Sequence, residues 1–336
     1  MNYLVLKQRI YLVISVLTLI VLGSGYGSCT KFSDRLSDSA MVALDSFHHC
    51  QYMARSRGIG AAGRRSEQFD YANLLSRHTT AEQLVEIANT DTSRITRLWA
   101  YRILLKKADN QVIDVLKQAL KDTTYVEMMS GCSEFEEPYN RAAISIYRYD
   151  SYELKLPNQL CFSLDSLIFF GYMKNKGFEN GLLMDFKPHK IYYATVIEEA
   201  DKGNYAILPL LAQYKNPNDR QRINKLLKAL LKEDGICSYE ACDAISNWND
   251  PAFEWYAKAA CQATIKQEYY DADEVLQLLC AYPAPWSYQI LKKLLTQKGD
   301  YSYSDTAKDY LTELYKTHPV PPIFKPLYDR YVARKK

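Results

Sequence analysis

The sequence predicts an all-α protein with a helical-repeat (α-solenoid) architecture, interrupted by an irregular central segment. Residues 92–107 and 111–120 fit two amphipathic helices joined by a short turn. Apolar residues of the second helix recur at i, i+3, i+4, i+7 and i+8, namely Val112, Val115, Leu116, Ala119 and Leu120. Similar stripes recur in residues 223–231 and 307–315. Two short helices cannot bury such stripes alone, so each pair requires a neighbouring pair.

The first 28 residues have the pattern of a signal peptide. Lys7 and Arg9 precede residues 10–22, which are apolar apart from a serine and a threonine. This run is too short to span a bilayer comfortably, because a spanning helix needs about 20 residues, but it suits the core of an export signal. Small residues then lead into Gly27, Ser28 and Cys29.

Gly27, Ser28 and Cys29 resemble the lipobox of bacterial lipoproteins. The resemblance implies that the Cys29 thiol is acylated and that Cys29 becomes the first residue of the mature chain. Thr30, in place of an aspartate, resembles the lipoproteins that are exported to the outer membrane. We therefore expect a lipoprotein of the bacterial cell envelope. An ordinary secreted signal or an uncleaved membrane anchor remains the alternative.

Residues 29–65 are expected to form a tether, with a possible helix from Asp38. Residues 58–63 match the dinucleotide-binding pattern GxGxxG, but that site needs a strand before the glycines. Residues 53–57 do not have the pattern of a strand, so we interpret the glycines as a flexible linker. The neighbouring cations are Arg55, Arg57, Arg64 and Arg65. They either contact anionic lipid headgroups, at about 1 kcal/mol each, or are solvated residues of a basic linker.

Residues 66–150 are expected to form the N-terminal helical repeats. A capping box at Thr80–Gln83 opens a helix over 81–88. The two amphipathic helices at 92–107 and 111–120 follow, and residues 123–137 interrupt the series of helices. Pro138 then opens the next helix, at the position where the missing N–H of proline costs nothing.

A family resemblance emerges in this region. Asp91 stands at a turn between helices, Arg97 and Ala100 lie in the next helix, and Asp122 and residues 141–143 (Arg-Ala-Ala) continue the pattern. These residues resemble HEAT repeats, and the resemblance implies stacked helix pairs. The interruption at 123–137 departs from a regular HEAT stack.

Residues 151–190 are expected to form an irregular connecting segment. Glycines and prolines punctuate it, residues 164–174 fit one buried helix, and residues 155–163 and 181–186 fit either a loop or a short strand. Residues 191–336 are expected to form the C-terminal helical repeats. Helix starts are indicated by Asn216-Pro217, by Asp250-Pro251 and by a capping-box pattern at 271–274.

The net charge and the number of cysteines limit the classes of partner and the disulfides that we expect. The net charge is +3, and it is +1 without residues 1–28, which contain two cations and no acid, so no nucleic-acid partner is expected. Seven cysteines remain after Cys29, so at least one is unpaired. Cys237 and Cys242 are close enough in sequence to form a disulfide, while Cys261 and Cys280 are expected to be buried apolar residues.

No catalytic, metal-binding or cofactor-binding residue is predicted. The mature chain contains no HExxH, GxSxG or paired CxxC pattern. His48, His49 and Cys50 are adjacent, so on a helix they point in different directions. We expect a lipid-anchored scaffold that binds a protein or peptide partner in the envelope. An envelope hydrolase or a glycan-binding lipoprotein remains the alternative, and whether the protein is an enzyme stays open.

Overall fold

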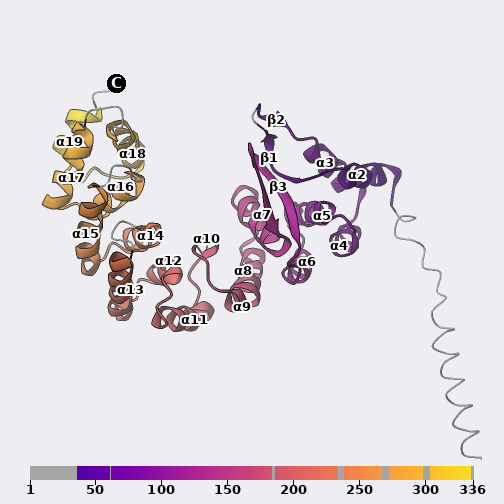
Figure 1. Cartoon of the computed structure of the whole chain (residues 1–336), viewed down its shortest axis with the longest axis horizontal. Coiled ribbons are helices and arrows are strands. Elements are labelled where there is room, and N and C mark those ends of the chain that lie inside the picture. The colour runs from indigo at the N-terminus through magenta and orange to yellow at the C-terminus, as the bar shows by residue number, and fades with distance from the viewer. Residues whose placement is uncertain are drawn as a thin grey trace, which may run out of the picture. The chain divides into compact units, whose positions relative to one another are not determined.

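The structure, a computed structural model, describes residues 36–60, 62–183, 186–233, 238–266, 272–297 and 303–333. The described chain is mostly helical and includes one four-stranded mixed sheet (Figure 1). It divides into two compact units, Met1–Leu164 and Asp165–Lys336, and the boundary falls within the connecting segment 151–190. The helical prediction is confirmed, but the expectation of an all-α fold was wrong. The expected signal peptide (1–28) and Cys29 lie outside the described residues.

In the described part of the first unit, six helices form a cluster in which five surround a buried one. They are α2 (Asp38–His48), α3 (Gln68–His78), α4 (Ala81–Thr90), α5 (Arg94–Lys106), α6 (Val112–Ala119) and α7 (Tyr139–Leu154). Helix α5 packs against all of the others and is buried on nearly every side, as expected for a helix that is apolar around most of its circumference. Helices α5 and α6 confirm the predicted pair, and Thr80 and Gln83 form the predicted capping box.

The strands of the first unit are two hairpins that pair with each other. They are β1 (Met53–Ile59), β2 (Arg64–Arg65), β3 (Tyr125–Gly131) and β4 (Ser133–Pro138), in the order β2-β1-β3-β4. Strands β1 and β3 are parallel, and the other pairs are antiparallel. Met53, Val126 and Met128 are buried, and α3, α5 and α7 contact the sheet.

Both hairpins correct the sequence-based interpretation. The predicted flexible linker is the β1–β2 hairpin, in which Gly60 and Gly63 have φ of +72° and +59°, values that glycine adopts without a Cβ penalty. A strand does precede the GxGxxG glycines, but the chain then forms β2 rather than entering a helix. The predicted interruption at 123–137 is the β3–β4 hairpin, with Gly131 at φ +57° in its turn.

The connecting segment is more helical than expected. It contains α8 (Asn158–Leu167), a π-helical turn η2 (Ile168–Met173), α9 (Lys174–Lys176) and α10 (Asn180–Leu183). The predicted buried helix at 164–174 is thus confirmed as a continuous helical run. Residues 158–163, which were expected to form a loop or a short strand, belong instead to α8, so that expectation was wrong. Phe169 anchors the run, because its ring packs 4.6 Å from the ring of Tyr192 and 5.8 Å from that of Phe186.

The second unit continues with helices to its end. They are α11 (Lys190–Asp201), α12 (Leu208–Gln213), α13 (Arg220–Glu233), α14 (Tyr239–Trp248), α15 (Glu254–Thr264), α16 (Ala272–Ala281), α17 (Pro285–Thr296), α18 (Ser304–Thr317) and α19 (Lys325–Tyr331). Short 3₁₀ turns η3 (Tyr205–Ile207), η4 (Pro217–Asp219) and η5 (Pro251–Phe253) precede three of them. Asn216 and Asp250 cap η4 and η5 as predicted, each accepting from the N–H two residues on.

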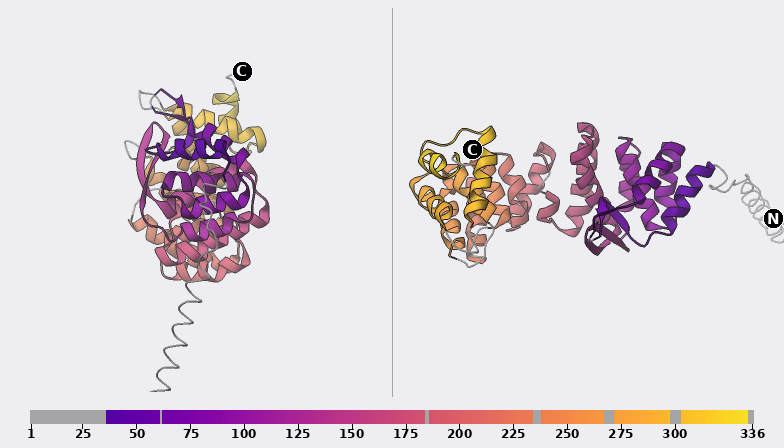
Figure 2. Two further views of the ribbon diagram at one scale, coloured as in Figure 1. Left: turned by 90° about the vertical axis from the view of Figure 1, so that its right-hand side faces the viewer. Right: turned by 90° about the horizontal axis from the view of Figure 1, so that it is seen from above.

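These helices pack in two series, which can be followed by their labels in Figure 1, and Figure 2 gives two further views. Helix α11 contacts α13, α13 contacts α15, and α15 contacts α17; likewise α12, α14, α16 and α18 pack in series. The first series begins at residues 190, 220, 254 and 285, so its starts are 30, 34 and 31 residues apart. The second begins at 208, 239, 272 and 304, with intervals of 31, 33 and 32 residues. Within each series, the next helix therefore begins after a nearly constant number of residues.

Candidate functional site

The four predicted arginines lie on one hairpin. Arg55 and Arg57 belong to β1, and Arg64 and Arg65 form β2. The guanidinium of Arg57 lies 5.7 Å from the ring centre of Phe69, and Arg65 forms an ion pair with Asp70. Arg55 lies 5.8 Å from the ring centre of Tyr149, and Arg64 is exposed. The structure thus brings the arginines together, but three of them already contact side chains of the first unit.

A buried ion pair ties β1 to the helices. Arg102 of α5 donates from Nε and Nη2 to the two carboxylate oxygens of Asp150 in α7, both at 2.7 Å. It also donates to the carbonyl oxygens of Ala54 and Arg55, both at 3.2 Å. Arg102 and Asp150 are almost fully buried, at 4% and 3% side-chain exposure. Both charges are therefore compensated within the core, and Arg102 also provides hydrogen-bond donors for two backbone carbonyl groups of β1.

Gln68 of α3 completes this attachment. Its Oε1 accepts from the N–H of Ala54 at 3.0 Å and from the indole N–H of Trp99 at 2.8 Å. Its Nε2 donates to the carbonyl oxygen of Tyr52 at 2.8 Å. A backbone edge that would otherwise be left without a strand partner is thus bonded by two side chains. This arrangement holds the arginine hairpin in a fixed position on the first unit.

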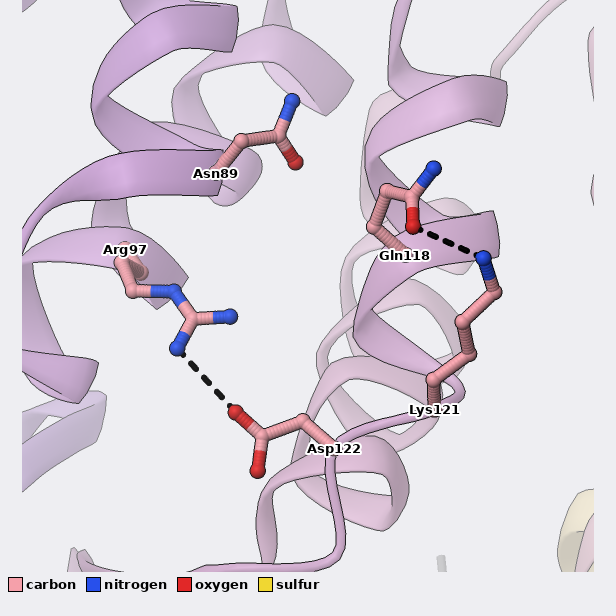
Figure 3. Close-up of a pocket in the computed structure, with 5 residues that line it drawn as sticks. All are labelled: Asn89, Arg97, Gln118, Lys121 and Asp122. Atoms are coloured by element: carbon pink, nitrogen blue, oxygen red, sulfur yellow. Dashed lines mark hydrogen bonds and ion pairs between the residues drawn. The ribbon is translucent and has the colours of Figure 1, made fainter.

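A polar groove of the first unit lies where α4 and α6 end and α5 begins (Figure 3). It has a volume of about 510 Å³, is open to solvent, and is lined by Asn89, Arg97, Gln118, Lys121 and Asp122. Arg97 and Asp122 point toward each other, and Lys121 points toward Gln118. Arg97 Nη1 donates to Asp122 at 3.1 Å, and Lys121 Nζ donates to Gln118 at 2.9 Å.

Asp122 is held as a carboxylate. Burial alone would raise its pKa, but hydrogen bonds from the hydroxyl and N–H of Thr124 and from Arg97 outweigh burial and lower the pKa. Arg97 is fixed in turn, because its Nε donates to the carbonyl oxygen of Ala88 and its guanidinium lies 4.4 Å from the ring centre of Tyr139. A carboxylate that is engaged in this way is a poor proton acceptor, so the groove is suited to binding polar or acidic groups rather than to acid–base catalysis.

A second groove lies between α13 and α15 in the second unit. Its volume is about 600 Å³, and it is lined by Gln221, Asn224, Lys225, Lys228, Ala252 and Trp255. Trp255 is 37% exposed, and its indole N–H donates to Asn224 Oδ1 at 2.6 Å. The ring is therefore held in one orientation with part of its face accessible.

A third groove, on α16 and α18, is acidic. It has a volume of about 690 Å³, and Asp273, Asp309, Glu313 and Tyr310 line part of it. Burial raises the pKa of the Tyr310 hydroxyl to about 12, so this tyrosine acts as a neutral hydrogen-bonding group. Within the described ranges, no group of three or more His, Cys, Asp or Glu side chains could hold a metal ion.

The remaining candidate ligands engage separate partners. His48 Nε2 lies 3.0 Å from an Asp91 carboxylate oxygen, whereas His49 Nδ1 lies 2.7 Å from the carbonyl oxygen of Asp45. Cys50, Cys132 and Cys280 are free thiols. Cys261 is buried, as predicted, whereas Cys280 is only half-buried. Partial burial still raises the pKa of the Cys280 thiol to about 11. Cys237, and with it the suggested disulfide to Cys242, lies outside the described residues.

Sequence reasoning identified only part of these grooves. Arg97 and Asp122 were recognised through the HEAT resemblance. Asp273 belonged to the capping-box pattern at 271–274 and Tyr310 to the apolar stripe at 307–315, but neither was predicted to line a groove. Polar residues at helix ends and on exposed helix faces carry no local signal that distinguishes a groove from an ordinary solvated surface. Trp255 has one weak signal, because it occupies a polar position beside the apolar stripe that starts at Phe253.

No protein-family model, no curated protein and no solved structure matches this chain. Among the residues that the structure describes, no helix combines the length and the apolar character needed to cross a membrane.

Proposed function

We propose that this protein is a lipid-anchored scaffold of the bacterial cell envelope, in which stacked helix pairs bind a protein or peptide partner. The single observation that supports it best is the double series of helices in residues 190–317. Stacks of this kind present extended, rigid surfaces, and proteins that are built from them commonly use those surfaces to hold other chains.

The packing supports an α-solenoid with a short repeat. Successive helix starts are 30 to 34 residues apart, below the roughly 40–47 residues of HEAT repeats and close to the roughly 33–34 residues of other two-helix repeats. Two arginine–aspartate ion pairs nevertheless support a HEAT-like architecture. Arg97 bonds Asp122 across the pair α5–α6, and Arg220 bonds Asp250 across α13–α14. We therefore propose a HEAT-like stack with a shortened repeat and the β3–β4 hairpin as an insertion.

The character of the grooves supports binding over catalysis. The grooves at α4–α6 and at α13–α15 are open, and their charged groups are either fixed in ion pairs or displayed as exposed lysines. Such surfaces match the polar and charged groups of a partner, and Arg and Trp are the residue types that most often dominate binding energy at protein interfaces.

The anchor is tested by metabolic labelling of the native host with a tagged palmitate, comparing the wild type with Cys29→Ala. We expect label on the wild type, no label on the variant, and recovery of the wild type in the outer-membrane fraction. An unlabelled wild type would remove the lipid anchor, and label that persists in Cys29→Ala would place the lipid elsewhere.

The scaffold role is tested by photo-cross-linking in the same cells. A photoreactive amino acid at position 121, in the groove of Figure 3, should give a discrete adduct with another envelope protein. The same substitution at the exposed Lys117, one turn before on α6 and outside the groove lining, serves as the control. Equal background from both positions would count against this groove as a partner surface.

A further inference from the structure

The groove between α13 and α15 combines an accessible tryptophan with a row of lysines. Lys225, Lys228 and Lys232 are exposed on α13 at positions i, i+3 and i+7, which lie on one face of a helix. Lys258 is exposed on α15, three residues after Trp255. The local surface is therefore strongly basic, although the whole chain is nearly balanced in charge.

These lysines are available to a partner. Among the described residues, none of the four has a carboxylate within ion-pair distance. The neighbouring arginines of α13 differ, because Arg220 is paired with Asp250, and Arg222 with Asp201 and Asp219. The arginines thus stabilise the stack, whereas the four lysines form no ion pair with a described residue. Lys225 acts on Asp201 only at longer range, where it helps Arg222 to lower the pKa of that carboxyl.

We propose that this groove binds an acidic amphipathic helix of a protein partner, with an apolar side chain of that helix on the face of Trp255. The inference rests on the proposed scaffold function and assigns it a docking site and a class of partner. The occupant is argued from charge complementarity and from the spacing of the lysines.

The spacing of the lysines matches a helix. A helix rises about 1.5 Å per residue, so the three lysines of α13 follow one another at axial steps of about 4.5 and 6 Å. Acidic residues at i, i+3 and i+7 of a second helix repeat the same steps. Helices α13 and α15 are neighbours in one series, so a helix placed between them packs its ridge into an existing groove.

The position of Trp255 disfavours a flat membrane surface. The ring is only 37% exposed, lines a groove, and is held by Asn224. A bilayer surface contacts protruding groups best, whereas an elongated ligand that lies in the groove reaches the recessed ring. The fixed ring also loses little conformational entropy on binding, as in other aromatic anchors.

The test is a binding measurement on the full chain in a non-ionic detergent. The probe is a fluorescein-labelled synthetic helix of about 20 residues, with glutamates at i, i+3 and i+7 and leucines on the adjoining face. A peptide of the same composition with the glutamates distributed around the helix is the control. Fluorescence anisotropy should show that the wild type binds the ordered peptide more tightly than the scrambled one.

The variants assign that binding to the groove. Lys225→Glu/Lys228→Glu and Trp255→Ala should each weaken it by about tenfold or more, and added salt should weaken it as well. Lys292→Glu/Lys293→Glu changes two exposed lysines of α17 outside the groove and should leave it within about twofold. Circular dichroism melts confirm that the variants stay folded.

Three outcomes would overturn the inference. They are equal binding of both peptides, indifference to the groove variants, and binding of polygalacturonate or of phosphatidylglycerol vesicles in place of the peptide. Photo-cross-linking in cells from position 221 separates this failure from that of the scaffold proposal. Adducts from position 121 but not from 221 would leave the scaffold proposal standing without this groove, and adducts from neither position would count against both.

Discussion

At the residue scale, Arg102 shows how a buried charge specifies an arrangement. Its guanidinium bonds the Asp150 carboxylate and two carbonyl oxygens of β1, and it lies 5.0 and 5.1 Å from the ring centres of Trp99 and Phe69. Desolvation of an ion pair often cancels its attraction, so the pair is not itself a large source of stability. The ion pair and its hydrogen bonds instead fix β1 in one position on α5 and α7.

Removing one partner of this pair should be costly. We expect Arg102→Met to lower the free energy of unfolding of the first unit by about 3–5 kcal/mol, because Asp150 is left as a buried, uncompensated charge. Hydrogen–deuterium exchange should show lost protection in residues 53–59. Arg65→Met removes an exposed pair with Asp70 and should cost no more than about 1 kcal/mol. Comparable losses in the two variants would contradict the assignment.

Gln68 supports a second prediction. Gln68→Met keeps the side-chain length but leaves the Ala54 N–H, the Tyr52 carbonyl and the Trp99 indole N–H without their partner. Since each buried group left unsatisfied costs about 1–3 kcal/mol, we expect a loss of at least about 3 kcal/mol, measured by chemical denaturation. Gln118→Met, at an exposed site on α6, should stay within about 0.5 kcal/mol.

At the element scale, the β3–β4 hairpin carries like charges opposite each other. Glu127 of β3 pairs in register with Glu136 of β4, and Glu134 is near. A hydrogen bond with Glu136 and repulsion from Glu136 and Glu134 raise the pKa of Glu127. Strand β4 is the last in the order β2-β1-β3-β4, so Glu134 and Glu136 lie on an edge strand of the sheet. Charged side chains there hinder pairing with a further strand.

This pair makes hairpin stability depend on pH. A carboxyl whose pKa is raised in the folded state binds its proton more tightly there than in the unfolded chain. The repulsive penalty is therefore complete above the raised pKa and fades as pH falls through it. We expect Glu136→Gln to raise the unfolding midpoint at pH 7 and to lose that advantage below about pH 4. Glu134→Gln, opposite Met129, should give a smaller gain. A pH-independent difference between Glu136→Gln and the wild type would refute the argument.

The same element scale shows what local sequence can predict. Helices α5, α6 and α13 were identified because the helical spacing of apolar residues is visible within each segment. The caps at Asn216 and Asp250 were recognised because a proline follows each of them. Strand β1 was missed because its partners are distant. Met53 pairs with Met128, and the backbone N–H and carbonyl of Ala54 are bonded by side chains of α3 and α5.

The candidate grooves were missed for the same reason. Trp255 and Lys225 stand 30 residues apart and become neighbours only when α13 and α15 pack in series. Overall charge also concealed the basic surface, because acids elsewhere in the chain balance its lysines. Residue types alone did not indicate a site, and their placement on adjacent helices did.

At the scale of the whole molecule, the two compact units predict separable stability. Contacts within the second unit join each helix to the next of its series, so a local change should spread to neighbours and then fade. Ile245 of α14 is fully buried, and Tyr282 after α16 donates to the carbonyl oxygen of Ile245. A substitution at Ile245 therefore tests whether helices of one series stabilise one another and whether the two units unfold separately.

Ile245→Ala should destabilise the second unit by about 2–5 kcal/mol, because it removes buried methyl groups and leaves a cavity. Hydrogen–deuterium exchange should show the largest loss of protection in α12, α14 and α16, a smaller one in α18, and none in α5. Leu104→Ala, at a fully buried site of α5, should give the reverse pattern. A uniform loss of protection along the chain would show one cooperative unit instead of two. A loss confined to α14 would show that the helices of a series do not stabilise one another, which would also remove the main support for a repeat stack.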